Sequence, residues 1–272
     1  MIRLGVTGAA GRMGEAVIEA ATEREDVEVA FGVDAADVED VQGVPVYKPA
    51  AFADLLGSHE PDAVIDFTVP EAAIEFATDC AEATVPLVTG TTGHDDLQFE
   101  TVAAASEQTP VLKATNFARG IQALLRTVSA AVEALPGYDI EVTETHHNQK
   151  RDAPSGTANT ILEEIQDARE DDQRESSERA SGETASSEDE FEEVYGREGI
   201  QPREDGEVGV HVRRAGDIRG EHEIMLAGND EVVTLTHRAE DRGVFAAGAI
   251  DAAVWLADQK PGWYEFGDVV DS

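Results

Sequence analysis

The stretch IRLGVTGAAGRMGEAVIEAATE, residues 2–23, decides how the fold begins. Its apolar run at 2–8 predicts a strand that ends in a glycine. From residue 11 to 23 the spacing is that of a helix with one apolar side, formed by Met13, Val17, Ile18 and Ala21. A strand followed at once by a helix is the opening unit of an α/β fold.

Three glycines join this strand to its helix. Gly8, Gly11 and Gly14 have the spacing G-x-x-G-x-x-G, a variant of the dinucleotide-binding fingerprint. Glycine lets the backbone approach a pyrophosphate, and the helix N-terminus supplies N–H groups and the positive end of its dipole. Asp34 ends the next predicted strand, where an acid accepts hydrogen bonds from an adenosine ribose. The alternatives are a tight turn without a ligand and a solvated acid.

The alternation of strands and helices continues to residue 116. Strands are predicted at 27–34, 63–68, 85–93 and 110–116, with helices at 70–83 and up to about residue 108. This order predicts a parallel, doubly wound sheet. The loops VTGTTG (88–93) and ATNF (114–117) then lie with the glycine loop at the carboxyl edge, where ligands bind. Three such loops favour a nicotinamide cofactor, although the last two could be plain connectors.

Beyond residue 116 the pattern changes. Helices are predicted at 121–135, 157–168 and 244–258, and strands at 139–147, 207–214, 222–228 and 231–239. Asn229 and Asp230 separate the last two strands and predict a hairpin turn. The fold class is therefore α/β: a Rossmann-like doubly wound parallel sheet plus a second α+β domain with a mixed, mainly antiparallel sheet. The domains expected are 1–117 with 240–272, for the dinucleotide, and 118–239, for substrate binding and oligomerisation.

The charge of the chain is strongly negative. Its 57 acidic and 20 basic residues give a formal net charge of −37, against a magnitude of roughly 2–8 that suffices for solubility. Such a field repels phosphate, so nucleic acids and anionic membranes are disfavoured as partners. Because the acids are spread along the chain, we favour adaptation to concentrated salt over an ordinary acidic cytosolic protein. An acidic insertion at about 169–193 lacks large apolar residues and predicts a disordered or loosely helical loop.

The only cysteine, Cys80, lies in a helical pattern and is expected to be a small buried side chain, so no intrachain disulfide can form. No signal peptide and no apolar run of membrane-spanning length is present, and the expected location is the cytoplasm.

The stretch ETHHNQKRDAPSGTA (144–158) concentrates basic residues in an acidic chain. Ser155, Gly156 and Thr157 open a helix whose N-terminus favours an anion, and Lys150 adds a full positive charge. A neighbouring histidine could act as a general acid at neutral pH. The alternative is a simple helix cap beside two ordinary strand histidines. A metal site is disfavoured, because adjacent strand residues point to opposite faces.

Taken together, GAAGRMG, IDFT, VTGTTG, ATNF, ETHHNQKRDAPSGTA, RAGDIRGEH and VFAAGAIDAAVWL resemble the 4-hydroxy-tetrahydrodipicolinate reductase family. The resemblance covers nearly the whole chain in order apart from the acidic insertion, and HH-x-x-K-x-DAPSGT is its most specific part. It implies reduction of a cyclic hydroxy-dicarboxylate by NADH or NADPH, with loss of water, on the diaminopimelate route to lysine. It also implies a homotetramer.

The resemblance implies roles for individual residues. The cofactor-binding residues would be Gly8, Ala9, Ala10, Gly11, Arg12, Met13, Asp34, Gly90, Thr91, Thr92, Ala114, Thr115, Asn116 and Phe117. The catalytic residues would be His146, as proton donor, and Lys150. The substrate carboxylates would be held by His147, Lys150, Ser155, Gly156 and Thr157. No metal is implied.

The residue after Asp34 bears on cofactor choice. Family members that accept NADP readily often carry a basic residue there, whereas this chain has Ala35. We therefore expect a preference for NADH, or near parity if salt screens the repulsion of a 2′-phosphate. Three alternatives remain at this point: a homoserine-type dehydrogenase, a redox-sensing regulator that binds NADH, and a binding protein that retains an inactive site.

Overall fold

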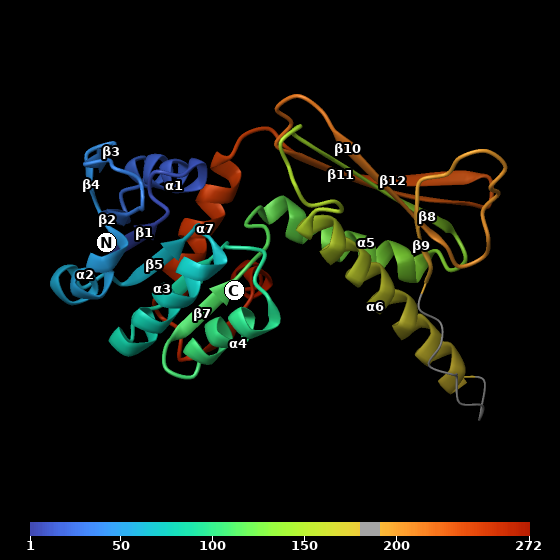
Figure 1. Ribbon diagram of the computed structural model, residues 1–272. Helices are drawn as coiled ribbons and strands as arrows, with labels where there is room; N and C mark the ends of the chain where they lie inside the picture. The colour runs from blue at the N-terminus through green and yellow to red at the C-terminus, as the bar shows by residue number, and fades with distance from the viewer. Residues whose placement is uncertain (180–190) are drawn as a thin grey trace. The chain divides into compact units, whose positions relative to one another are not determined.

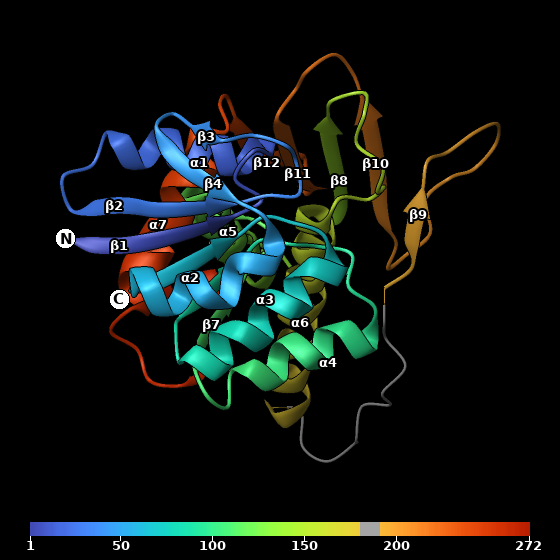
Figure 2. The same ribbon diagram turned by 60° about the vertical axis from the view of Figure 1, so that its left-hand side comes forward.

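The computed structural model describes residues 1–179 and 191–272, with the backbone alone for 171–179. The chain divides into two compact units, Met1–Arg119 with Arg242–Ser272 (unit 1) and Gly120–Asp241 (unit 2). Figures 1 and 2 show the elements of each unit from two directions.

Unit 1 is built on one eight-stranded sheet in the order β13-β7-β6-β5-β1-β2-β4-β3. Its strands are β1 (Ile2–Thr7), β2 (Val27–Val33), β3 (Asp40–Val41), β4 (Val44–Tyr47), β5 (Ala63–Asp66), β6 (Leu87–Thr89), β7 (Pro110–Lys113) and β13 (Gly262–Tyr264). Every neighbouring pair is parallel except β3 with β4. The predicted parallel sheet is confirmed.

Helices cover both faces of this sheet (Figure 1). They are α1 (Arg12–Thr22), α2 (Phe52–His59) with a 3-10 turn η1 (Pro49–Ala51) before it, α3 (Pro70–Ala83), α4 (Asp96–Ala105), α7 (Gly243–Leu256) and α8 (Phe266–Val270). Successive side chains of β5 supply both cores: Ile65 packs with α1 and α7, and Val64 packs with α2 and α3. Cys80 is fully buried on α3, as predicted. The sheet is therefore doubly wound.

Several short elements of unit 1 were not predicted. The strands β3, β4 and β13 and the helices α2 and α8 carry too few residues for a clear period, and β4 contains Pro45. Such strands form because a neighbouring strand already offers its hydrogen-bonding edge.

Unit 2 has a five-stranded sheet in the order β12-β11-β8-β10-β9. Its elements are α5 (Arg119–Ala134), β8 (Asp139–His146), α6 (Gly156–Arg179), β9 (Glu193–Tyr195), β10 (Val208–Arg214), β11 (Gly220–Gly228) and β12 (Glu231–Ala239). Strand β11 is antiparallel to both neighbours, whereas β8, β10 and β9 run parallel to one another. The helices α5 and α6 lie on one face (Figures 1 and 2), so the mixed α+β prediction is confirmed.

The predicted turn between β11 and β12 is confirmed. Gly228 pairs with Glu231, and Asn229 and Asp230 have φ values of 49° and 64°. Both residues therefore adopt the left-handed region that a two-residue hairpin turn requires.

The predicted end of a helix near residue 168 is wrong, because α6 continues to Arg179. Glutamate and arginine are good helix formers even where no apolar face guides them. The prediction of a disordered or loosely helical loop otherwise falls on residues 180–190, which lie outside the described residues.

Candidate active site

The glycine loop lies between β1 and α1 in unit 1. Gly8 has φ +74°, and a Cβ there would lie 2.3 Å from the carbonyl oxygen of Phe67. A Cβ on Gly14 would lie 2.1 Å from the carbonyl oxygen of Gly8. Gly11 occupies the N-cap of α1, where no side chain caps the helix. Backbone geometry thus requires glycine at 8 and 14, and the N-terminus of α1 presents backbone alone.

The other predicted residues of this loop differ in exposure. Ala9 is buried against the sheet, Ala10 and Met13 are half-buried, and Arg12 is exposed. The amide of Ala10 donates to Oδ2 of Asp34 at 2.9 Å, and the amide of Ala36 donates to Oδ1 at 2.7 Å. The structure therefore brings Asp34 to the glycine loop, as the fingerprint predicts.

Lys48 lies beside the same loop, a feature that sequence spacing did not reveal. Its Nζ contacts the carbonyl oxygens of Ala35 and Ala36 at 3.2 and 2.8 Å, and Asp37 at 3.4 Å. Parallel pairing of β2 with β4 brings the residue there. A positive charge therefore lies at the segment that follows Asp34, although Ala35 is neutral.

The ends of β1, β5 and β6 meet around a buried acid, Asp66, that was not predicted as a site residue. Its Oδ1 accepts from the hydroxyls of Thr7 at 2.7 Å and Thr68 at 2.6 Å. Its Oδ2 accepts from the hydroxyls of Thr89 at 2.8 Å and Thr91 at 2.7 Å. An acid at the end of an otherwise apolar strand, in IDFT, was the available signal.

The remaining predicted cofactor residues differ in how they are placed. Gly90 is pressed against the ring of Phe67, since a Cβ there would lie 2.2 Å from it. Phe117 is buried and packs edge-on against the rings of Phe67 and Phe266. Thr92 and Thr115 are exposed, while Ala114 and Asn116 are half-buried. Thr91 is therefore held by a hydrogen bond to Asp66, and Phe117 is packed among aromatic rings. Thr92 and Thr115 are exposed in the loops that follow their strands.

In unit 2, residues of the stretch ETHHNQKRDAPSGTA lie around Glu144, a fully buried acid on β8. Oε1 accepts from the amide of Ser155 at 3.0 Å and from Nη2 of Arg214 at 2.8 Å. Oε2 contacts Nη1 of Arg214 at 2.9 Å and Nδ1 of His146. Burial would raise the pKa of Glu144, but hydrogen bonds from His146 and Arg214 outweigh it and lower the pKa to about 2.

The rings of His146 and His222 meet edge to face, and His222 lies next to Ser155. Their ring centroids are 5.3 Å apart, and Nε2 of His222 is 3.3 Å from Oγ of Ser155. Burial, followed by the charge of His146, lowers the pKa of His222 to about 3, so this ring is neutral at ordinary pH. The hydroxyl of Ser155 also accepts from the amide of Ala158 at 3.2 Å, as a helix cap does.

The motif's other residues are near this cluster in the chain but differ in exposure. Nζ of Lys150 contacts Asp152 at 2.9 Å. Nδ1 of His147 accepts from the amide of Gln149 at 3.3 Å, and its side chain is half-buried. Gly156 and Thr157 begin α6. His146 and Ser155 are thus brought together with Glu144, Arg214 and His222.

The stretch RAGDIRGEH had no derived role from the sequence. In the structure Arg214 ends β10 and pairs with His146 in register, while Gly220 and His222 begin β11. The stretch therefore forms one wall of the cluster.

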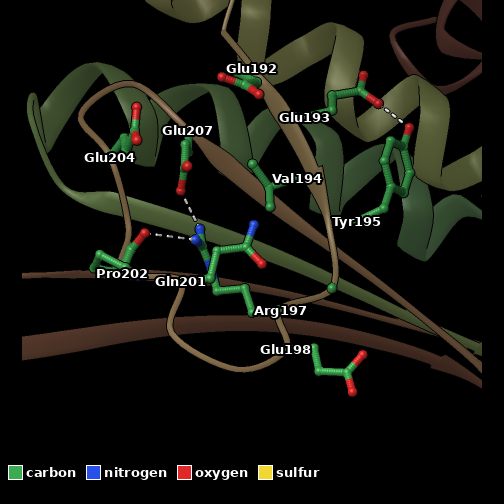
Figure 3. Close-up of a pocket in the computed structure, with 11 residues that line it drawn as sticks. Glu192, Glu193, Val194, Tyr195, Arg197, Glu198, Gln201, Pro202, Glu204 and Glu207 are labelled. Carbon is green, nitrogen blue, oxygen red and sulfur yellow. Dashed lines mark hydrogen bonds and ion pairs between the residues drawn. The ribbon is translucent and has the colours of Figure 1, made fainter.

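A pocket of unit 2, with a volume of about 730 Å³, lies around β9 and the loop that follows it (Figure 3). Five glutamates line it, Glu192, Glu193, Glu198, Glu204 and Glu207. Among its described lining residues Arg197 is the one cation, and it is paired with Glu207. This pocket does not suit an anionic substrate.

Within the described part of the chain, no three His, Cys, Asp or Glu side chains are grouped to hold a metal ion. No described helix is both long and apolar enough to cross a membrane.

The fold and the two sites define the class. Unit 1 has a doubly wound sheet with a glycine loop, and unit 2 has an α+β fold with a histidine–carboxylate cluster. This combination is typical of a two-domain, Rossmann-like oxidoreductase. Residues 2–117 match the family model "Dihydrodipicolinate reductase, N-terminus", and residues 120–270 match "Dihydrodipicolinate reductase, C-terminus". The chain belongs to the dihydrodipicolinate reductase family.

Two sequence relatives are similar to this chain over nearly its full length. The 4-hydroxy-tetrahydrodipicolinate reductase of Haloarcula marismortui is 54% identical, covering 100% of both chains. That of Natronomonas pharaonis is 55% identical, covering 97% of this chain and 98% of the relative. A dipicolinate-bound dihydrodipicolinate reductase from Paenisporosarcina sp. has a similar structure, with a TM-score of 0.74 and 26% identity over 98% and 99% of the two chains. Both sequence relatives are haloarchaeal, consistent with adaptation to salt.

Proposed function

We propose that this enzyme reduces 4-hydroxy-tetrahydrodipicolinate to tetrahydrodipicolinate and water, in lysine biosynthesis by the diaminopimelate route. Full-length similarity to reductases of that name supports the activity. The observation that carries the proposal is the cluster in unit 2, where His146 contacts a buried carboxylate beside the N-terminus of α6. A proton donor and an anion site are thereby combined.

The proposed cofactor is NADH or NADPH, bound by unit 1. The uncapped N-terminus of α1 and the glycines at 8 and 14 fit a pyrophosphate, because they allow close approach of the backbone. Asp34 retains lone pairs for the ribose hydroxyls while its two oxygens accept from Ala10 and Ala36. The dinucleotide, when bound, supplies the hydride.

The chain's own residues would supply the proton and hold the substrate. Water would form from the ring hydroxyl and a proton of the adjacent carbon, which leaves a double bond in the ring. The hydride would add to one carbon of that double bond, and His146 would donate the proton to the other. Lys150, His147 and the Ser155–Gly156–Thr157 segment would hold the carboxylates. Dipicolinate, a dicarboxylate, is bound in the Paenisporosarcina reductase, which supports a substrate of this kind. A homotetramer remains our expectation for the assembly.

The test is a coupled assay. The preceding synthase makes the substrate in situ, and oxidation of NADH and NADPH is followed by absorbance. We expect oxidation only when substrate, enzyme and cofactor are all present. Absence of turnover with both cofactors, in high salt and with folded protein, would reject the proposal.

A further inference from the structure

Glu144 is buried without any exposed surface, yet it carries a negative charge. Burial of a carboxylate is costly unless a partner and hydrogen bonds compensate it. Arg214 contacts both of its oxygens, and the amide of Ser155 adds a further donor. Arg214 thus neutralises the charge without occupying every acceptor site, and the carboxylate still contacts His146.

This contact determines which ring nitrogen of His146 carries a proton. An ionised carboxylate can only accept, so Nδ1 of His146 must be the donor. Glu144 and His146 are two residues apart on β8 and therefore lie on the same face of the sheet. The proton that leaves during reaction must then come from Nε2.

The surroundings of Nε2 agree with this role. Gly220 on β11 lies near this nitrogen, since a Cβ there would be 3.2 Å from Nε2. A glycine at this position therefore places no side chain against Nε2. The charged and titratable groups around the ring are Glu144 on β8, Arg214 on β10, His222 on β11, and Lys150 with Asp152 in the following loop. Of these described groups, the carboxylate of Glu144 is the one in hydrogen-bond contact with a ring nitrogen of His146.

We propose that Glu144 is a positioning residue for the reaction: with Arg214, it fixes His146 with Nδ1–H on the carboxylate and leaves Nε2 to donate the proton. The inference rests on the proposed function, in which His146 is the donor. During turnover the Nε2–H bond breaks, the proton passes to the substrate, and solvent later restores it. The Nδ1–H bond stays intact throughout, since the carboxylate stabilises the imidazolium before transfer.

Glu144→Gln tests the role through the pH profile. Glutamine keeps the shape but removes the charge that stabilises the imidazolium. We expect kcat at neutral pH to fall about 10- to 100-fold, the basic limb of the kcat profile to move to lower pH, and KM to change less than about threefold. Glu144→Asp keeps the charge, so its basic limb should stay at the wild-type pH even if kcat falls.

The chain provides a matched control. Glu141 lies on the same strand and contacts His211 and Arg203, which is a similar His–Glu–Arg arrangement outside the motif. Glu141→Gln should leave the basic limb in place. A folded Glu144→Gln enzyme with the wild-type profile would overturn the proposal, as would the same shift in Glu141→Gln.

A measurement on the wild-type protein does not depend on any variant folding. In ¹⁵N NMR spectra, neutral His146 should be the Nδ1–H tautomer, with its signals assigned by their loss in His146→Gln. The Nε2–H tautomer would overturn the proposal. This readout needs no turnover, so failure of the proposed reaction and failure of the positioning role are distinguishable.

Discussion

At the scale of single residues, His146 and His222, whose rings are in contact, have different environments. His146 contacts the carboxylate of Glu144, whereas Nδ1 of His222 is buried without a hydrogen-bond partner among the described residues. Sequence chemistry gives the two rings the same properties. The carboxylate on one ring and burial of the other separate them, and only the first is suited to hold a transferable proton.

Replacement of the donor should affect the rate and leave the fold intact. For His146→Gln we expect kcat to fall by about 10² to 10⁴, because general acid catalysis typically contributes that much. Steady-state assays with circular dichroism to verify folding measure the effect. His211→Gln, in which the ring also contacts a glutamate, is the control and should keep wild-type kcat. Wild-type turnover in His146→Gln would exclude the role.

Lys48 changes the expectation for cofactor choice. Ala35 alone predicts a preference for NADH, but the ammonium of Lys48 stands at the carbonyls of Ala35 and Ala36. We therefore expect near parity in wild type. Lys48→Gln should raise KM for NADPH about three- to fivefold in dilute buffer, the effect of one exposed charge contact, with KM for NADH nearly unchanged.

The matched control is Lys260→Gln, another exposed lysine of unit 1. It should leave both KM values as they are, and molar KCl should abolish the effect of Lys48→Gln. Equal changes for NADH and NADPH would mean that Lys48 does not face a 2′-phosphate.

At the scale of elements, the ends of β1, β5 and β6 are joined through Asp66 and its four threonine hydroxyls. The carboxylate accepts from one threonine at the end of β1, from one that follows β5, and from two at the end of β6 and just after it. Since all of these bonds are short and the acid is fully buried, the loops are held in one arrangement. The same loops were predicted to contact the cofactor.

Asp66→Asn should loosen these loops. An amide has one oxygen to accept and its nitrogen faces hydroxyl oxygens, so several hydroxyls must reorient or lose a partner, at about 1–3 kcal/mol each. We expect a lower Tm and roughly tenfold weaker NADH binding, measured by thermal unfolding and fluorescence titration. Asp62→Asn, which removes the charge from an exposed acceptor of the Arg3 amide, should change neither strongly. Wild-type binding in Asp66→Asn would contradict this role.

The strand pair β8–β11 should make unit 2 sensitive to acid. Burial lowers the pKa of His222 from 6.5 to about 3, so its stabilising contribution is complete above pH 6.5 and is lost as the pH falls towards 3. The pKa of Glu144 is lowered from 4.5 to about 2, so its contribution is complete above pH 4.5 and is lost as the pH falls towards 2. Each pH unit in these windows contributes up to about 1.4 kcal/mol per group.

Urea unfolding between pH 7 and 4 measures the first window. His222→Asn should flatten the pH dependence there, because asparagine does not titrate. An unchanged slope in His222→Asn would show that this ring does not control the acid response.

At the scale of the whole molecule, charge dominates. A net charge of −37 opposes the compact state and any association of like-charged subunits. It also slows the approach of an anionic substrate and cofactor. The two haloarchaeal relatives are consistent with a protein whose working medium supplies the screening.

We expect stability, assembly and turnover to rise from dilute buffer into molar KCl. The Debye length falls from roughly 10 Å at 0.1 M to about 3 Å at 1 M, so neighbouring carboxylates cease to repel one another. Thermal unfolding, sedimentation and NADH oxidation across a KCl series measure the three responses. A non-ionic osmolyte is the control, and flat or falling responses to KCl would refute adaptation to salt.

The sequence by itself determined the fold class, the glycine loop and the family. Each of these depends on local periodicity or on spacing within one continuous segment, as in IRLGVTGAAGRMG, Asn229–Asp230 and ETHHNQKRDAPSGTA. It also indicated the helix N-terminus at Ser155, because a cap is a local feature.

Only the tertiary structure decided which distant residues complete the sites. Parallel pairing of β8 with β10 brings Arg214 to Glu144, and pairing of β2 with β4 brings Lys48 to Ala35. The packing of strand ends likewise surrounds Asp66 with four threonine hydroxyls. Burial keeps the ring of His222 neutral. Strand register and burial depend on contacts across the chain, and a period read along one segment cannot contain them.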